Sequence, residues 1–386
     1  MKNNIFYIFL SIVLTIYVSG NAYIFIRGWQ ALPQGALIKG IYSFLILLPA
    51  SAFILGEFSE KTGLMEDNRF LIIVGSVWLA FLLYAVLLTF AIDIVRIFNY
   101  FIGFLPDKEW MIKNNIPLKL MGAVTVITSI IVFTGLVTAS SPIVKTIHIE
   151  MDKKAGSLKE LNIVMASDIH LGNIIGTNKL SILAEKINSL DPDIVLFPGD
   201  IFDETLGPVV KNNHGGIMES IKAGYGIYAV TGNHEYIGGV NDAVNYLLKH
   251  GVKLLRDEAV VIDNSFILAG REDLSMGRFT GETREDLPQI LNGVNNNLPL
   301  ILMDHQPYSI GESVKNGVDL HLSGHTHNGQ LWPFNYITRK LYEISHGYKK
   351  INSTHVYVSN GYGTWGPPVR TTGRPEIVNI KVKFKE

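Results

Sequence analysis

The chain contains no cysteine among its 386 residues. Disulfide bonds, thiolate zinc sites and cysteine nucleophiles are therefore excluded. Charge of one sign is also scarce, because 33 Lys and Arg stand against 34 Asp and Glu and leave a net charge of −1. Without an overall positive field, nothing in the composition indicates a nucleic-acid partner.

Hydrophobic residues are abundant and unevenly distributed. They make up 48% of the chain, and the mean hydropathy of +0.25 is high for a wholly soluble protein. Four apolar runs precede residue 140, at 4–26, 40–56, 70–92 and 118–139. Each approaches the roughly 20 residues that an α-helix needs to cross hydrocarbon. We expect four transmembrane helices; the alternatives are buried core helices and, for the first run, a signal peptide.

The cations that flank these runs are equally numerous on the two sides, so their count leaves the orientation undecided. The densest cationic loop joins the third and fourth runs, which favours a cytoplasmic position for that loop and an extracytoplasmic position for the C-terminus. We expect an integral protein of the plasma membrane, with a membrane domain over residues 1–140 and a catalytic domain over 141–386.

After residue 140, short apolar runs alternate with helix-like segments. Runs typical of strands that are covered on both faces lie at 144–150, 161–167, 193–199, 226–232, 265–270, 298–304, 318–324 and 355–361. Segments 178–190 and 240–251 carry apolar residues at helical spacing. This order predicts an α/β sandwich.

Residues able to bind metals follow five of the predicted strands. The motifs are SDIH, PGDIFDE, TGNHEY, MDHQP and SGHTH, with candidate residues Asp168, His170, Asp200, Asp203, Asn233, His234, Asp304, His305, His325 and His327. Because the ligand crevice of an open α/β sheet lies outside the carboxyl ends of its strands, we expect these side chains to meet. Strand alternation further predicts that Asp168 and His170 share one face, as do His325 and His327.

Carboxylate, amide and imidazole ligands without sulfur suit hard or borderline divalent cations. The set is too large for one tetrahedral zinc and is sufficient for two adjacent ions. Two ions about 3.5–4 Å apart clamp the attacking and leaving oxygens in phosphoryl displacement. A carboxylate is needed to bridge them, and Asp200 is the natural candidate. Each motif alone is compatible with a structural turn, whereas all five in this order, each after a strand, indicate a metal site.

These ordered motifs resemble the calcineurin-like metallophosphoesterase superfamily over about residues 145–386. GHTHNGQLWP and the closing YVSNGYGTWGPPVRTTGRPEI resemble its membrane-associated branch more closely. The resemblance implies a four-layer α/β/β/α sandwich, here preceded by four transmembrane α-helices. It also implies a metal-dependent phosphoric ester hydrolase.

The resemblance assigns roles to individual residues. One metal would be held by Asp168, His170 and His327, and the other by Asn233, His305 and His325, with Asp200 between them. Each chain would bind two divalent ions, and the sequence does not choose among manganese, iron and zinc. His234 would act as a catalytic residue on the leaving group or on transition-state charge. Asn328 replaces the usual glycine after the last histidine, which should alter the rim and leave the ligands intact.

The role of four further residues is less constrained. Arg370 is expected either to bind a substrate phosphate or to be a plain surface arginine. Asp203, Asp304 and Glu235 are expected either to orient imidazoles or to be surface or capping residues. The GYGTWG stretch at 361–366 fits a dinucleotide fingerprint, but the PPVR that follows forbids the necessary helix.

The leading hypothesis is a membrane-anchored phosphodiesterase or pyrophosphatase in which a metal-bridging hydroxide attacks phosphorus. Spans without internal charge argue against transport and suggest an anchor, hence a substrate near the bilayer. A UDP-diacylglucosamine-like glycolipid or a phospholipid would fit a role in lipid metabolism, while a soluble nucleotide or a cell-wall phosphodiester stays open. The alternatives are a non-catalytic membrane receptor that uses the same metal site and a structural protein with one stabilising metal.

Overall fold

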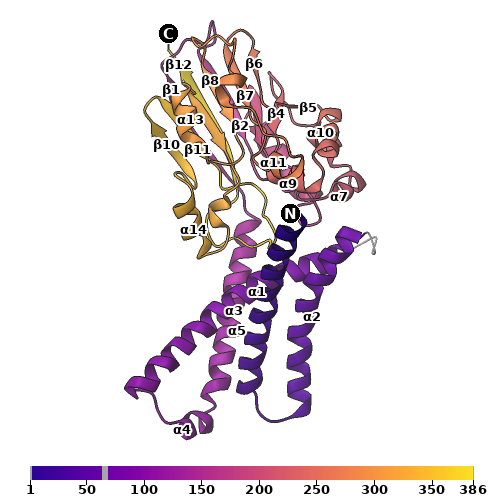
Figure 1. Cartoon of the computed structure of the whole chain (residues 1–386), viewed down its shortest axis with the longest axis vertical. Helices are drawn as coiled ribbons and strands as arrows, with labels where there is room; N and C mark the ends of the chain where they lie inside the picture. Colours follow the sequence, from indigo (N-terminus) through magenta and orange to yellow (C-terminus); the bar gives the residue numbers. More distant parts are fainter. Residues whose placement is uncertain (1, 63–67, 386) are drawn as a thin grey trace. The chain divides into compact units, whose positions relative to one another are not determined.

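The computed structural model describes residues 2–62 and 68–385, with the backbone alone for residues 2–7, 9, 10, 60 and 61 (Figure 1). The chain divides into two compact units, residues 1–136 with 366–369 and residues 137–365 with 370–386. The domain boundary at residue 140 stays a prediction.

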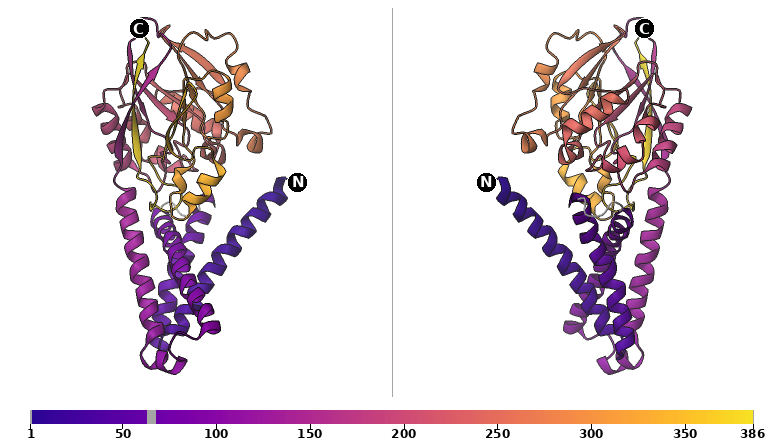
Figure 2. Two further views of the ribbon diagram at one scale, coloured as in Figure 1. Left: turned by 90° about the vertical axis from the view of Figure 1, so that its left-hand side faces the viewer. Right: turned by 90° about the vertical axis from the view of Figure 1, so that its right-hand side faces the viewer.

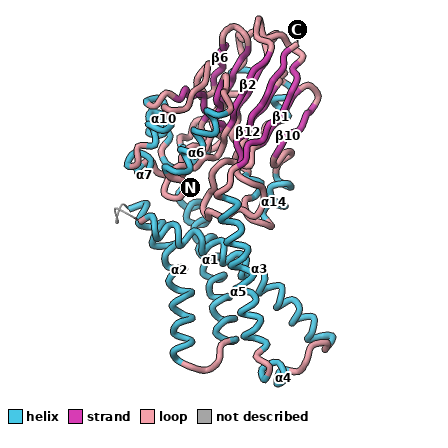
Figure 3. Tube along the Cα trace, turned by 180° about the vertical axis from the view of Figure 1, so that it is seen from behind, coloured by secondary structure: helices cyan, strands magenta, loops and turns pink. Residues whose placement is uncertain are grey.

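The first unit is helical (Figure 3). Its helices are α1 (Lys2–Ala31), α2 (Ala36–Thr62), α3 (Arg69–Ile102), the short α4 (Lys108–Lys113) and α5 (Ile116–Ala139). Among the described residues, α2, α3 and α5 each hold a stretch that is long and apolar enough to cross a membrane. The first expected span, 4–26, lies within α1, but part of it falls outside the residues whose side chains are described. Three of the four expected spans are thus found.

Helices α1 and α3 extend beyond the apolar runs that predicted them, and the extensions carry charge. Asp93 in α3 binds Arg27 of α1 at 2.6 Å and Arg96 of α3 at 2.9 Å. The hydroxyl of Tyr23 donates to Asp93 Oδ2 over 2.6 Å. The apolar runs 4–26 and 70–92 themselves hold no charge, but the helices that contain them do, at positions just beyond the runs. These charges occupy a site that ties α1 to α3.

The second unit is built on two six-stranded sheets. The first runs in the order β1 (Ile143–Met151), β12 (Glu376–Phe384), β2 (Glu160–Met165), β3 (Ile194–Pro198), β4 (Ile227–Val230) and β5 (Val252–Leu254). The second runs β10 (Gly347–Ile351), β11 (Thr354–Val358), β9 (Leu320–Ser323), β8 (Leu300–Met303), β7 (Phe266–Gly270) and β6 (Glu258–Ile262). Strands β2 to β5 are parallel to one another, as are β7, β8, β9 and β11. The carboxyl ends of the central strands therefore lie at one end of each sheet.

Helices cover the outer faces of both sheets (Figure 2). The helices of this unit are α6 (Thr177–Ser189), α7 (Gly207–Lys211), α8 (His214–Met218), α9 (Asn233–Gly238), α10 (Val240–Lys249), α11 (Met276–Phe279), α12 (Leu287–Ile290), α13 (Ile310–Lys315) and α14 (Phe334–Leu341). Leu183 of α6 and Leu247 of α10 pack on the first sheet, whereas Leu287 of α12 packs on the second.

The two sheets face each other through a separate apolar core, to which Leu196 of β3 and Leu322 of β9 belong. Strands β3, β4, β7 and β8 are apolar throughout because both of their faces are buried. The four-layer α/β/β/α architecture is confirmed.

Candidate metal centre

Five strands deliver the predicted ligands just beyond their carboxyl ends. Asp168 and His170 follow β2, Asp200 follows β3, and Asn233 with His234 opens α9 after β4. In the second sheet, the ligands after β8 and β9 are His305, His325 and His327. The structure gathers six of these side chains into two groups, which we call the first group (Asp168, His170, His327) and the second group (Asp200, His305, His325). Each sheet supplies three of the six.

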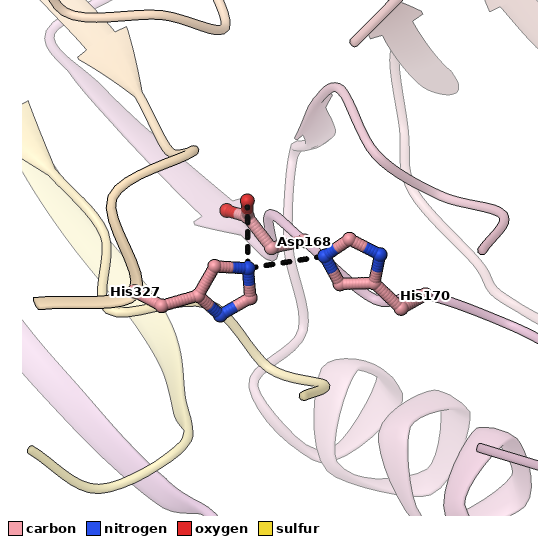
Figure 4. A group of neighbouring side chains, drawn as sticks. All are labelled: Asp168, His170 and His327. Atoms are coloured by element: carbon pink, nitrogen blue, oxygen red, sulfur yellow. Dashed lines mark hydrogen bonds and ion pairs between the residues drawn. The ribbon is translucent and has the colours of Figure 1, made fainter. Parts of the chain in front are cut away.

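In the first group, three buried side chains point toward one another from two sheets (Figure 4). His170 Nε2 lies 3.0 Å from His327 Nε2, which lies 3.4 Å from Asp168 Oδ1. Asp168 Oδ2 is buried and has no hydrogen-bond partner among the described residues. An unsatisfied buried carboxylate oxygen is costly, and a cation would satisfy it. The donor atoms of the first group therefore fit a divalent metal.

The second group has the same character. His305 Nε2 lies 3.1 Å from Asp200 Oδ2, but it forms no well-directed hydrogen bond within the described part of the chain. His325 Nδ1 lies 2.8 Å from Asn233 Oδ1, which places the amide oxygen beside this group. Asp200 Oδ2 is also 3.9 Å from His170 Nε2 of the first group. Asp200 thus stands between the two groups, as a bridging carboxylate would.

The backbone at these residues is unusual. Asp168, His170, Asp200, His325 and His327 have φ of 53°, 52°, 51°, 69° and 47°. Such left-handed conformations cost non-glycine residues free energy and gather at functional sites. None of the five lies in a strand, so strand alternation does not aim them. His325 and His327 accordingly belong to different groups, and the expectation that they share one face is wrong.

Asn328 also has a left-handed backbone, with φ of 50°. Asparagine adopts this conformation more readily than most residues other than glycine. The replacement of the usual glycine is therefore compatible with the local fold.

Two glycines make room for the carboxylates. A Cβ at Gly232 would lie 2.2 Å from Asp200 Oδ1, and one at Gly324 would lie 2.1 Å from Asp168 Oδ2. Both stand inside the predicted motifs, TGNHEY and SGHTH, but the sequence reasoning gave them no role. The signal was their position immediately before a candidate ligand.

Backbone donors fix the two carboxylates. The N–H of His325 donates to Asp168 Oδ1 over 2.8 Å, and the N–H of His234 donates to Asp200 Oδ1 over 2.9 Å. In Asp200 this leaves Oδ2 facing His305 and His170, whereas in Asp168 the bonded Oδ1 is also the oxygen nearest His327. Similarly, Nδ1 of His305 donates to the carbonyl of Pro198 over 2.8 Å, which directs Nε2 toward Asp200.

Glu235 organises the Asp200 loop. Its carboxylate accepts the N–H groups of Asp200, Ile201, Phe202 and Gly232 over 2.7–3.0 Å. These partners are backbone groups, so the imidazole-orienting alternative is wrong for Glu235. For Asp304 neither expectation holds, because the residue is fully buried and its carboxylate pairs with Arg284 at 2.9 Å and lies 3.7 Å from Arg271.

His234 lies against the first group without belonging to it. Its Nδ1 donates to the carbonyl of Asp203 over 2.7 Å, and its ring meets that of His170 edge-on at 4.6 Å. Asp203 Oδ1 is 3.5 Å from His234 Nδ1 and 3.7 Å from His170 Nδ1. Of the three acidic residues considered, Asp203 is the one placed beside imidazoles.

Burial and charge divide the histidines into two kinds. Burial lowers the pKa of His170 and His327 well below 6.5 and that of His325 to about 3. These imidazoles are therefore neutral at pH 7, the form that binds metals. Burial alone would lower the pKa of His234, but the Asp200 and Asp203 charges raise it above 6.5. His234 thus has a raised pKa beside these three imidazoles, and the Asp200 carboxylate likewise raises the pKa of His305 well above 6.5.

The structure places Arg370 behind His327. Its Nη2 donates to Nδ1 of His327 over 3.0 Å and to the carbonyl of Gly363 over 2.6 Å. Only 1% of the residue is exposed, so it is not a surface arginine. A contact between Arg370 and substrate phosphate stays a prediction.

Comparison with known proteins agrees with this geometry. Residues 161–329 match the model of the calcineurin-like phosphoesterase family. An uncharacterized metallophosphoesterase of Campylobacter jejuni is 31% identical over 386 residues, covering 99% of this chain and all of its own length. The chain belongs to the metallophosphoesterase family. It is accordingly a metal-dependent phosphoric ester hydrolase.

Two further relatives span less of the chain. A metallophosphoesterase of Aquifex aeolicus is 34% identical over 58% of this chain and 86% of its own length. A transmembrane protein with metallophosphoesterase domain from Danio rerio is 33% identical over 67% of this chain and 61% of its own. Together with the apolar helices, such relatives support an integral membrane protein.

Proposed function

We propose that the chain is a membrane-anchored hydrolase of phosphodiesters or pyrophosphates that uses two divalent ions. Asp168, His170 and His327 would hold one ion, and Asn233, His305 and His325 the other, with Asp200 between them. When bound, the two ions would supply an activated water and neutralise developing negative charge. The observation that carries the proposal is the position of Asp200 Oδ2, 3.1 Å from one group's histidine and 3.9 Å from the other's.

His234 is the candidate general acid. Its raised pKa favours the protonated ring, and the Asp203 carbonyl accepts from Nδ1, so that Nε2 is the nitrogen left for a substrate. A leaving alkoxide would take that proton as the P–O bond breaks.

The short connection between helix α5 and the catalytic domain favours a substrate at the bilayer. Helix α5, long and apolar enough to cross a membrane, ends at Ala139, only a few residues before β1 starts at Ile143. We therefore favour a lipid-linked phosphoester, such as a phospholipid or a UDP-diacylglucosamine-like glycolipid. The same proposal places the catalytic domain, residues 141–386, on the extracytoplasmic side of the plasma membrane.

The test uses the full chain in detergent micelles. Metal content is measured by mass spectrometry, and hydrolysis is assayed with chromogenic phosphodiesters and monoesters in the presence of manganese. We expect two ions per chain and turnover that a chelator abolishes. Asp200→Asn should lower both metal content and turnover, and His234→Ala should lower turnover by about 10²–10⁴-fold with metal retained. His148→Ala, on the exposed face of β1, is the matched control.

Two outcomes would overturn the proposal. Two bound ions without hydrolysis of either soluble or bilayer-embedded phosphoesters would favour the receptor. One ion per chain, unaffected by Asp200→Asn, would favour a single stabilising metal.

A further inference from the structure

Helix α14 (Phe334–Leu341) packs with its apolar side outward. Phe334, Ile337 and Leu341 fall on one stripe of the helix at spacings of three and four residues. They are 41%, 54% and 61% exposed, whereas the polar Asn335 is only 8% exposed. A helix of a soluble domain normally buries such a stripe. This stripe therefore lacks cover within the described part of the catalytic unit.

Two exposed tryptophans extend the stripe toward the metal centre. Trp332 precedes α14 and is 47% exposed, and Trp365 is 59% exposed. Gln330 exchanges two hydrogen bonds with the backbone of Trp365, at 2.9 and 3.0 Å. The ring of Trp365 lies 6.3 Å from that of His234. We call Trp332, Phe334, Ile337, Leu341 and Trp365 the apolar rim.

The charge of α14 points to one kind of partner. The only charged residues of the helix are Arg339 and Lys340, both exposed, and it carries no acid. An amphipathic helix with aromatic and aliphatic residues on one side and cations at its edge is typical of helices that lie in a membrane interface. Tryptophan is itself enriched at that depth.

One short segment connects the apolar rim to the point where the chain leaves α5. The hydroxyl of Thr371 accepts the N–H of Trp332 over 2.7 Å. Three residues later, Arg374 Nη2 donates to the carbonyl of Ser141 over 3.0 Å, and Lys179 Nζ donates to that of Ala139 over 2.9 Å. Four residues reach at most roughly 14 Å when extended. The apolar rim thus begins close to the end of a helix that is apolar enough to cross a bilayer.

We propose that the apolar rim inserts into the interface of the bilayer that α5 spans, with Arg339 and Lys340 against anionic lipid phosphates. The insertion itself needs no catalytic activity. One consequence rests on the proposed function: the metal centre, which adjoins α14 through the turn at His327–Gly329, would meet phosphoesters of amphiphilic lipids at the membrane surface.

The absence of cysteine makes a direct test simple. Ile337→Cys in the full chain takes a single environment-sensitive fluorophore, and the protein is placed in nanodiscs of phosphatidylcholine and phosphatidylglycerol. We expect a blue-shifted label that is quenched several-fold by lipids carrying a nitroxide near the headgroup. Val261→Cys is the matched control, since this apolar residue of β6 is 47% exposed. Its label should stay in water and unquenched.

Three results would overturn the proposal. The two labels behave alike, the Ile337 label stays unquenched, or it is shielded only as protein concentration rises, which would indicate a second copy as the partner. Leu341→Cys repeats the measurement at a second position of the stripe.

A functional arm separates this inference from the proposed function. Ile337→Asp combined with Leu341→Asp should leave hydrolysis of a water-soluble phosphodiester unchanged and lower that of a bilayer-embedded one by about tenfold. Equal activity of variant and wild type on both substrates would contradict the inference. If the wild type hydrolyses neither ester, the proposed function fails, and the label positions still decide the insertion.

Discussion

Arg370 holds His327 from behind the metal centre. Its guanidinium donates to Nδ1 of the ring over 3.0 Å and is anchored by the carbonyl of Gly363. Because a guanidinium cannot accept a hydrogen bond, Nδ1 is the acceptor, and the proton of the neutral ring lies on Nε2, which faces His170 and Asp168 and would lose that proton to a bound metal. Arg370 is therefore a positioning residue for the first group.

Arg370→Lys should loosen this ring. The ammonium keeps the charge but cannot reproduce the planar fork that reaches both acceptors. We expect manganese affinity to fall by about 10–100-fold, the usual effect of losing a residue that orients a ligand. Titration of bound manganese measures it. The control is Arg374→Lys, on the same segment but bonded to the backbone of Ser141; equal affinities of the two variants would refute the role.

Gly324→Ala tests the close approach at Asp168. The added Cβ would meet Asp168 Oδ2 at 2.1 Å and Ser167 Oγ at 1.9 Å, so the carboxylate must move. We expect the first group to lose metal, visible as a lower stoichiometry by mass spectrometry. Gly311→Ala is the matched control, because nothing lies within 4 Å of its Cβ in helix α13. Full metal content in Gly324→Ala would show that the loop adjusts without cost to the site.

Most strands of the catalytic unit can be predicted from apolar runs that end in polar residues. All eight expected strands are present. Strands buried on both faces, such as β3, β4, β7 and β8, leave an uninterrupted apolar signature. The four strands that the sequence did not predict, β5, β6, β10 and β12, lack this apolar signature. The edge strands β6 and β10 are partly exposed, β5 has three residues, and β12 carries Glu376, Asn379 and two lysines.

The site shows a different limit. Residue types and order predicted which side chains meet, but their directions come from backbone conformations that alternation does not describe. Asp200 takes its place from a left-handed φ of 51°, the four N–H groups that bind Glu235 and the space left at Gly232. The position of Arg370 likewise depends on the fold of residues 361–370, which the sequence presents only as a Gly- and Pro-rich loop.

His321 gives the catalytic unit a pH-dependent stability. It is fully buried in β9 between the hydroxyls of Ser313 and Ser323, each 2.7 Å from a ring nitrogen. Burial lowers its pKa from 6.5 to about 4. Between pH 4 and pH 6.5, His321 therefore binds a proton in the unfolded chain but not in the folded chain. The contribution of a neutral His321 to the free energy of unfolding is fully present above pH 6.5. It falls by up to about 1.4 kcal/mol per pH unit as the pH drops from 6.5 toward 4.

The variant His321→Gln removes this titration and keeps a neutral polar side chain. Thermal unfolding of both proteins in detergent should show a steeper loss of midpoint with acidification in the wild type. Parallel curves would mean that His321 does not titrate in this range.

The Arg27–Asp93–Arg96 cluster should stabilise the helical unit only modestly. Helix α3 has 34 residues, about 51 Å at 1.5 Å per residue, and exceeds the roughly 30 Å of hydrocarbon. Asp93 follows a first apolar stretch that already suffices for a span, and the side chains of its partners Arg27 and Arg96 are 39% and 43% exposed.

Asp93→Asn should therefore lower the free energy of unfolding by about 1–2 kcal/mol, less than for a fully buried pair. Unfolding by sodium dodecyl sulfate in mixed micelles measures the change. Glu109→Gln, an exposed residue in the first turn of α4, removes the same charge and should cost a few tenths of a kcal/mol. A larger loss of unfolding free energy in Asp93→Asn than in Glu109→Gln would show that Asp93 stabilises the helical unit through its pairs with Arg27 and Arg96. Equal losses of unfolding free energy in the two variants would mean that the cluster stabilises the unit no more than an exposed surface charge does.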